Sequence, residues 1–188
     1  MLDILYSKLK KKITLLSKEQ IVECADTELC DGAATKDVLP YLKKGLVLEK
    51  DYPYTLSKNA TLAGKCEKKK IKNIAVKIKD YAIITGEDKI AASLPTCPVA
   101  IRIHVGKVLQ MYMKGIAIPT TVTCPNEEID LNHCLIVAGC RTSSIPLIGD
   151  YWVLRNSWGK SWGMQGYMYI KKGVKACGIG VTGFTIKI

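Results

Sequence analysis

The fold is indicated most clearly by one stretch, Tyr151-Trp152-Val153-Leu154-Arg155-Asn156-Ser157-Trp158-Gly159-Lys160-Ser161-Trp162-Gly163. Its first four residues are aromatic or aliphatic, which predicts a buried strand, and the polar and glycine residues after them predict a turn. Asn156 starts that turn, so its amide oxygen can accept a hydrogen bond from a neighbouring group. Trp158 stands two residues further on, where its ring can cover such a bond and keep water away from it.

A second stretch, Asn132-His133-Cys134-Leu135-Ile136-Val137-Ala138-Gly139, places a histidine at the mouth of another apolar strand. A histidine can carry a proton near neutral pH, and it needs a partner that fixes its tautomer. His133 and Asn156 together match the base and the orienting residue of a Cys-His-Asn triad. A purely structural role for His133 stays open here, because one His and one Asn are weak evidence alone.

The two halves of the chain differ in pattern, and together they predict an α+β fold. In the first half, apolar residues recur at helical spacing and predict an amphipathic helix. These residues are Ile4, Leu5, Leu9 and Ile13. Ser17 can cap a second helix, and Gln20 three residues later can reach back to complete a capping box.

A third helix is expected from about Asp37 to Lys44, with Gly45 ending it. Pro40 is compatible with that helix if it lies in the first turn. The second half is expected to consist of strands, because residues 99–105 alternate between apolar and other residues. Short apolar runs predict further strands at 135–138, 151–154 and 167–170.

Composition restricts the class of protein. The chain has 188 residues and a net charge of +11, and its lysines cluster at 8–12 and 65–72. A nucleic-acid partner is not expected, because no aromatic residue is interleaved with these lysines to stack on bases. Solvated surface lysines are the preferred interpretation. No apolar run reaches membrane-spanning length, and residues 1–12 lack the continuous apolar region of a signal peptide.

The eight cysteines are widely spaced and include no C-x-x-C pair. This pattern fits disulfides in an oxidising compartment better than a metal or redox site, so neither a metal nor a cofactor is expected. The triplet Asn59-Ala60-Thr61 is a glycosylation sequon, which suits the same export route.

The two stretches above, together with L-S-x-E-Q-x-V-E-C from Leu16 and D-Y-P-Y from Asp51, resemble the papain and cathepsin family of cysteine peptidases. The resemblance runs from about Leu16 to the C-terminus. It implies a papain-like fold, with an incomplete helical left lobe at 1–70 and an antiparallel, β-barrel-like right lobe at 71–188.

The resemblance also implies roles for individual residues. His133 matches the general base, Asn156 the amide that orients it, and Trp158 the tryptophan that shields both. Gly32 and Ala33 match the backbone wall that pairs with extended substrate, where the family usually has two glycines. Cys134 and Arg102 fall where the family lines its main specificity pocket. If Arg102 points there, an acidic substrate side chain would be favoured.

The same resemblance implies disulfides between Cys24 and Cys66 and between Cys124 and Cys177. Cys30 would pair with a cysteine that precedes the nucleophile in the family and is absent from these 188 residues. No pairing is implied for three further cysteines. These are Cys97, Cys134 and Cys140.

The family nucleophile lies in a C-G-S-C-W segment, which does not occur in this sequence. Matching the block at Leu16 to the family places Met1 inside the helix that follows the nucleophile, about two turns after it. Cys134 is not expected to replace it, because neighbours on a strand point to opposite faces. The chain is therefore expected to be a C-terminal portion without the catalytic cysteine, inactive as given.

Two functions remain in view. The first is a thiol endopeptidase whose complete gene product acts on peptides or proteins, binds cystatin-like inhibitors, and resides in the lysosome or outside the cell. The second is a papain-like homologue without a nucleophile that binds peptides or inhibitors.

Overall fold

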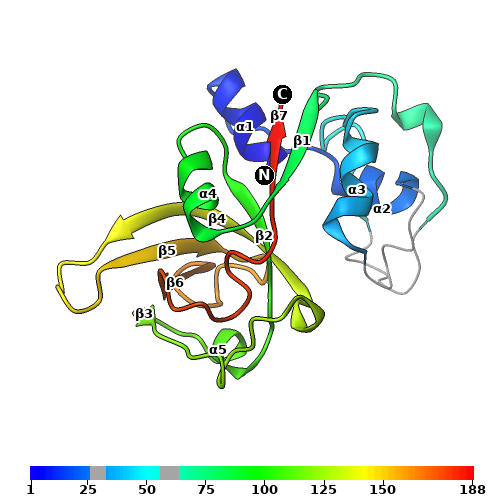
Figure 1. Ribbon diagram of the computed structural model, residues 1–188. Coiled ribbons are helices and arrows are strands. Elements are labelled where there is room, and N and C mark those ends of the chain that lie inside the picture. Colours follow the sequence, from blue (N-terminus) through cyan, green and yellow to red (C-terminus); the bar gives the residue numbers. More distant parts are fainter. Residues whose placement is uncertain (26–32, 56–63) are drawn as a thin grey trace. The chain divides into compact units, whose positions relative to one another are not determined.

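The computed structural model describes residues 1–25, 33–55 and 64–188 (Figure 1). The chain divides into two compact units. We call Leu2–Tyr81 with Ile186–Ile188 the helical unit, and Ala82–Thr185 with Met1 the sheet unit. The division falls between Tyr81 and Ala82.

Helices and strands follow the order expected of an α+β chain. The helical segments are α1 (Leu2–Lys10), α2 (Lys18–Cys24), α3 (Thr35–Leu42), η3 (Lys68–Lys70), α4 (Glu87–Ser93), α5 (Lys107–Gln110) and η4 (Glu128–Asp130). The strands are β1 (Asp80–Ile84), β2 (Val99–Ile103), β3 (Ile116–Ala117), β4 (His133–Thr142), β5 (Asp150–Arg155), β6 (Tyr167–Lys171) and β7 (Gly183–Lys187). Every helix in the described part of the chain is too short or too polar to span a bilayer.

The described strands form one seven-stranded sheet in the order β1-β7-β2-β4-β5-β6-β3. Strand β4 pairs antiparallel with both β2 and β5, and β5 pairs antiparallel with β6, so these strands lie side by side in Figure 1. A register shift between Val137 and Gly139 marks a bulge in β4. The expected antiparallel arrangement has one exception among these pairs, because β3 runs parallel to β6.

The core of the sheet unit follows from the alternation seen in the sequence. Val99, Ile101 and Ile103 on β2 are buried, as their period of two predicts. Each expected apolar run lies inside a strand: 135–138 in β4, 151–154 in β5 and 167–170 in β6. Trp152 is completely buried, and its indole Nε1 donates to Glu87 Oε2 at 2.8 Å, which attaches the start of α4 to the sheet.

Helix α1 buries a different face from the one expected. Leu2 and Tyr6 are buried, whereas Leu9 and Ile13 are 65% and 86% exposed. The helix ends at Lys10, and Lys11 turns the chain with a φ of 50°, so Ile13 does not continue the helical stripe. The predicted amphipathic face was therefore wrong, because the apolar spacing in the sequence continues past Lys10, where the helix ends.

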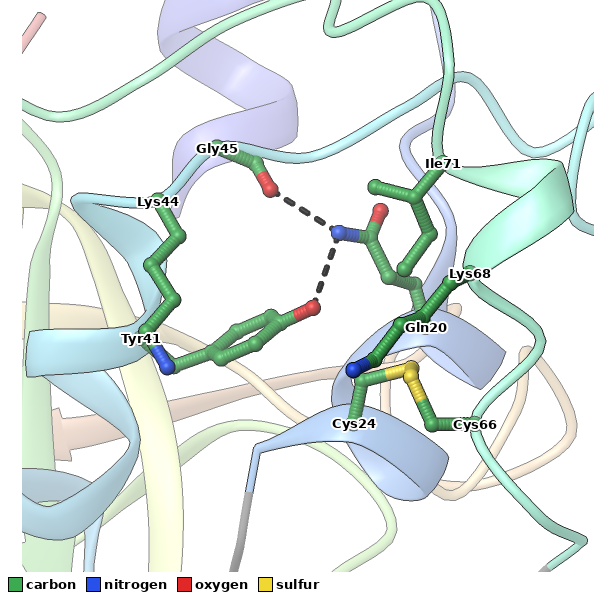
Figure 2. A pocket seen from close by; sticks show the side chains of 8 residues that line it. All are labelled: Gln20, Cys24, Tyr41, Lys44, Gly45, Cys66, Lys68 and Ile71. Atoms are coloured by element: carbon green, nitrogen blue, oxygen red, sulfur yellow. Dashed lines mark hydrogen bonds between the residues drawn. A yellow bond between two sulfur atoms is a disulfide. The ribbon is translucent and has the colours of Figure 1, made fainter.

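The capping box predicted at Ser17 is half right. Ser17 Oγ accepts from the Gln20 backbone N–H at 2.9 Å, as expected of an N-cap. The Gln20 side chain does not reach back to Ser17. Its Nε2 donates instead to Tyr41 Oη at 3.0 Å and to Gly45 O at 2.9 Å, as Figure 2 shows, and its Oε1 accepts from Val47 N at 2.9 Å. The buried Gln20 amide thus links α2 to α3 and to the residues that follow α3.

Helix α3 begins two residues before the expected start at Asp37, so Pro40 lies in its second turn rather than its first. Pro40 there removes one hydrogen bond of a short helix, which ends soon afterwards at Leu42. Gly45 has a φ of 102°, a conformation that favours glycine, and its N–H bonds to Leu42 O at 3.2 Å.

The described residues form two disulfides, Cys24–Cys66 and Cys124–Cys177, the same pairs that the family resemblance implies. The first lies in the helical unit and the second in the sheet unit. Cys30 and Gly32, along with the sequon at 59–61, lie outside the described residues.

Replacing Gln20 with leucine should destabilise the chain. It leaves Val47 N–H and Gly45 C=O without their side-chain partner, and we expect a loss of about 2 to 4 kcal/mol in the free energy of unfolding. Urea denaturation followed by circular dichroism measures this loss. Gln110→Leu makes the same change at an exposed position, and should alter stability by less than about 0.5 kcal/mol. Equal midpoints for the two variants would contradict the role given to Gln20.

Candidate active site

His133 and Asn156 come together because β4 and β5 are neighbours. His133 is the first residue of β4, and Asn156 directly follows the last residue of β5. The antiparallel register pairs Ile136 with Arg155, so the beginning of one strand meets the end of the other. His133 Nε2 lies 2.9 Å from Asn156 Oδ1, although 23 residues separate them in the sequence.

The orientation of the Asn156 amide fixes the tautomer of His133. The Ser157 backbone N–H donates to Asn156 Oδ1 at 2.7 Å, which identifies that atom as the carbonyl oxygen. A carbonyl oxygen only accepts, so His133 Nε2 carries a proton and donates it to Asn156. In the neutral ring this leaves Nδ1 as the nitrogen that can accept a proton.

The Asn156 side chain is buried beside His133 and bonds through its oxygen. The backbone N–H of Asn156 bonds to Gly166 O at 2.9 Å. Its Nδ2 has no hydrogen-bond partner among the described residues. A buried donor left unpaired costs free energy, whereas the oxygen of the same amide makes two hydrogen bonds, to His133 and to Ser157.

A row of aromatic rings supports the His–Asn pair. The Trp158 ring centroid lies 5.2 Å from that of His133, and Trp162 meets Trp158 edge to face at 5.3 Å. Tyr112 extends the row, at 5.7 Å from Trp162. Trp158 remains 37% exposed, so part of its ring faces solvent while the ring contacts His133.

Tyr112 was not identified from the sequence. Burial raises the pKa of its phenol, which keeps the hydroxyl protonated. That hydroxyl donates to Gly115 O at 2.5 Å and accepts from Tyr169 N at 3.1 Å. Tyr112 stands far upstream of Trp162 in the chain, and no local pattern reveals that the two rings meet.

Arg102 and Cys134 lie together on another part of the sheet unit. They are register partners in the β2–β4 pair, so their side chains share one face, while Ile103 and His133 share the other. Arg102 is occupied by two contacts within the protein: its guanidinium pairs with Glu128 and also donates to Leu131 O at 2.6 Å. Ala33 is exposed and belongs to the helical unit.

A hollow of about 450 Å³ lies in the helical unit, between Gln20, Tyr41 and the Cys24–Cys66 disulfide (Figure 2). Lys44 and Lys68 also line it. The Gln20 amide inside it already bonds to Tyr41 and Gly45, so its polar atoms serve the fold. Among the described residues, no group of three or more His, Cys, Asp or Glu is arranged to hold a metal ion.

Comparison with known sequences identifies the family. The family described as "Papain family cysteine protease" matches residues 1–185. The chain belongs to this family. It is 34% identical over 173 residues to an aleurain-like thiol protease of Arabidopsis thaliana, covering 87% of this chain and 45% of that protein. It is 32% identical over 177 residues to pro-cathepsin H of Bos taurus, covering 89% of this chain and 49% of that protein.

Solved structures agree with this papain-like fold. The Amb a 11 cysteine protease of ragweed pollen, in its proform, is 26% identical with a TM-score of 0.82, covering 100% of this chain and 56% of that one. The bromelain protease of Ananas comosus has a TM-score of 0.83 at 22% identity, covering 99% of this chain and 84% of that one, a likeness of fold alone. The chain spans about half the length of the curated relatives it matches.

Replacing Asn156 with alanine should free the imidazole of His133. Without the acceptor, the Nε2–H proton exchanges rapidly with water and its low-field NMR signal disappears. Nitrogen-15 spectra of the histidine rings then show a mixture of tautomers in place of one. Asn73→Ala, at an exposed position of the helical unit, is the matched control and should leave the His133 signals unchanged. A single unchanged tautomer in the Asn156 variant would contradict the orienting role.

Replacing Trp158 with alanine should expose the same bond without removing it. The Nε2–H signal should still be visible in the cold. On warming, it should broaden at a lower temperature than in the parent chain, because water reaches the pair more often. The exchange rate of this proton, measured by NMR from about 5 to about 25 °C, tests this expectation. An identical exchange rate would show that Trp158 does not shield the pair.

Proposed function

We propose that the complete protein is a thiol endopeptidase in which His133 is the general base and Asn156 holds its imidazole. The observation that carries this proposal is the 2.9 Å bond from His133 Nε2 to an Asn156 oxygen whose identity Ser157 fixes. Because this bond engages Nε2, the nitrogen that takes up the proton in the reaction is Nδ1 of His133. Membership of the papain family supports the same reaction class.

In the proposed reaction a cysteine thiol gives its proton to His133 Nδ1, and the thiolate attacks the carbonyl carbon of a peptide bond. The C–N bond then breaks, and the protonated His133 donates its proton to the leaving amine. Water, deprotonated by the same imidazole, cleaves the resulting thioester and releases the acid and the thiol. Asn156 stabilises the ring in each step because it accepts from Nε2–H throughout.

The thiol is proposed to come from a C-G-S-C-W segment that these 188 residues do not contain. Cys134 is a poor substitute, because it lies on the opposite face of β4 from His133. We therefore propose that this chain alone is inactive. Peptides or proteins are the proposed substrates and cystatin-like proteins the proposed inhibitors.

A lysosomal or extracellular location is proposed for the complete gene product. The two disulfides support it, because such bonds persist in oxidising compartments. The sequon at residues 59–61 is consistent with the same route.

A second candidate function is a papain-like protein that binds peptides or inhibitors without cleaving them. Sequencing the transcript upstream of Met1 distinguishes the two candidates. An in-frame segment of that kind supports the peptidase, whereas a stop codon directly upstream supports the binding protein.

If the segment is present, the extended protein should hydrolyse fluorogenic peptides. His133→Ala should then lower kcat/KM by at least about 10³-fold, because the members of a triad act as a unit. Lys107→Gln, at an exposed position on α5, is the control and should leave kcat/KM within about twofold of the parent. Substantial activity in the His133 variant would reject the proposed base.

A further inference from the structure

The segment that leads into His133 is tied to β2 and to the residues just after it at three consecutive positions. His104 Nδ1 bonds to Asp130 O at 3.0 Å, and Arg102 donates to Leu131 O at 2.6 Å. Asn132 bonds through both ends: its N–H donates to Ile103 O at 3.2 Å, and its Oδ1 accepts from Val105 N at 2.7 Å. The backbone immediately before His133 is therefore set by residues 102–105.

Arg102 makes the most extensive of these contacts. Besides Leu131 O, its guanidinium binds Glu128 Oε1, and the other carboxylate oxygen of Glu128 accepts from Thr182 Oγ1 at 2.7 Å. The Arg102 side chain is 28% exposed and that of Glu128 is 52% exposed. An ion pair at such a partly exposed position contributes little to global stability. What distinguishes this pair is its location, because it holds η4 against β2.

Leu131 is held from a second direction as well. It is buried, and its side chain packs over Gly178, whose φ is +82°. A Cβ built on Gly178 would lie 2.1 Å from Leu131 Cδ2, so only glycine leaves room for this side chain. Asn126 Oδ1 accepts from Gly178 N at 2.8 Å, which fixes the other end of the same segment. The segment is therefore already fixed by packing around Leu131. Arg102 adds to this a hydrogen bond to the Leu131 carbonyl oxygen.

We propose that Arg102, paired with Glu128, is a positioning residue for His133. The Arg102 bond to Leu131 O lies two residues before His133, so it holds the backbone that leads into the histidine. The inference rests on the proposed role of His133 as the base.

Hydrogen exchange in the 188-residue chain tests the positioning. In Arg102→Gln, the Leu131 and Asn132 amides should exchange about tenfold faster, and the His133 Nε2–H signal should shift and broaden. Glu128→Gln should produce a smaller effect of the same kind, because the bond to Leu131 O remains. Arg141→Gln is the matched control, since Arg141 is an exposed arginine on β4. The Leu154 amide, in the buried part of β5, is the internal reference for global opening.

Two results would overturn the positioning role. One is unchanged exchange at Leu131 and Asn132 in Arg102→Gln with an unchanged His133 signal. The other is equal acceleration at Leu131, Asn132 and Leu154, which would make the pair a general contributor to stability. If Arg102→Gln fails to fold, Glu128→Gln decides between the same outcomes, because it removes a charge and keeps the size of the side chain.

Peptide cleavage by the extended protein tests the proposed function separately. An extended parent protein that cleaves no peptide would reject the proposed function, and hydrogen exchange would still decide whether Arg102 positions the segment.

Discussion

The hydrogen bond between His133 and Asn156 exists because β4 and β5 pair in one register. A slip of one residue would move Asn156 by about 3.4 Å and reverse the face to which its side chain points. Two features oppose that slip: the bulge between Val137 and Gly139, and the complete burial of Trp152 in the middle of β5. The geometry of the pair therefore depends on the packing of the sheet, several residues away from either group.

The sheet unit could largely be predicted from the sequence, because its information is local. Alternation marked β2, apolar runs marked β4, β5 and β6, and the N-S-W-G turn placed Asn156 directly after a strand. The family resemblance then related these pieces to one another. His133 and Asn156 could be proposed as partners because each has a recognisable sequence environment, although nothing between them indicates their distance.

The parts that were missed depend on contacts between distant residues. Gln20 carries the pattern of a capping box, yet its amide bonds to Tyr41, Gly45 and Val47, and no local rule chooses between these partners. The ion pair of Arg102 with Glu128 could not be predicted either, because Glu128 is supplied by a segment 26 residues further along the chain. Helix α1 was misjudged for a simpler reason, because the turn at Lys11 interrupts an apolar period that looks continuous in the sequence.

The Cys124–Cys177 disulfide closes a covalent ring of chain that contains both His133 and Asn156. The β4–β5 connection, where Leu147 is 91% exposed, is a part of that ring that is open to another protease. A single cut there would leave both cut ends attached to the same molecule through the sulfur bridge. On a denaturing gel the cut protein would migrate as one band without reductant and as two bands with it. In the folded protein, the strands that carry the histidine and the asparagine would stay paired.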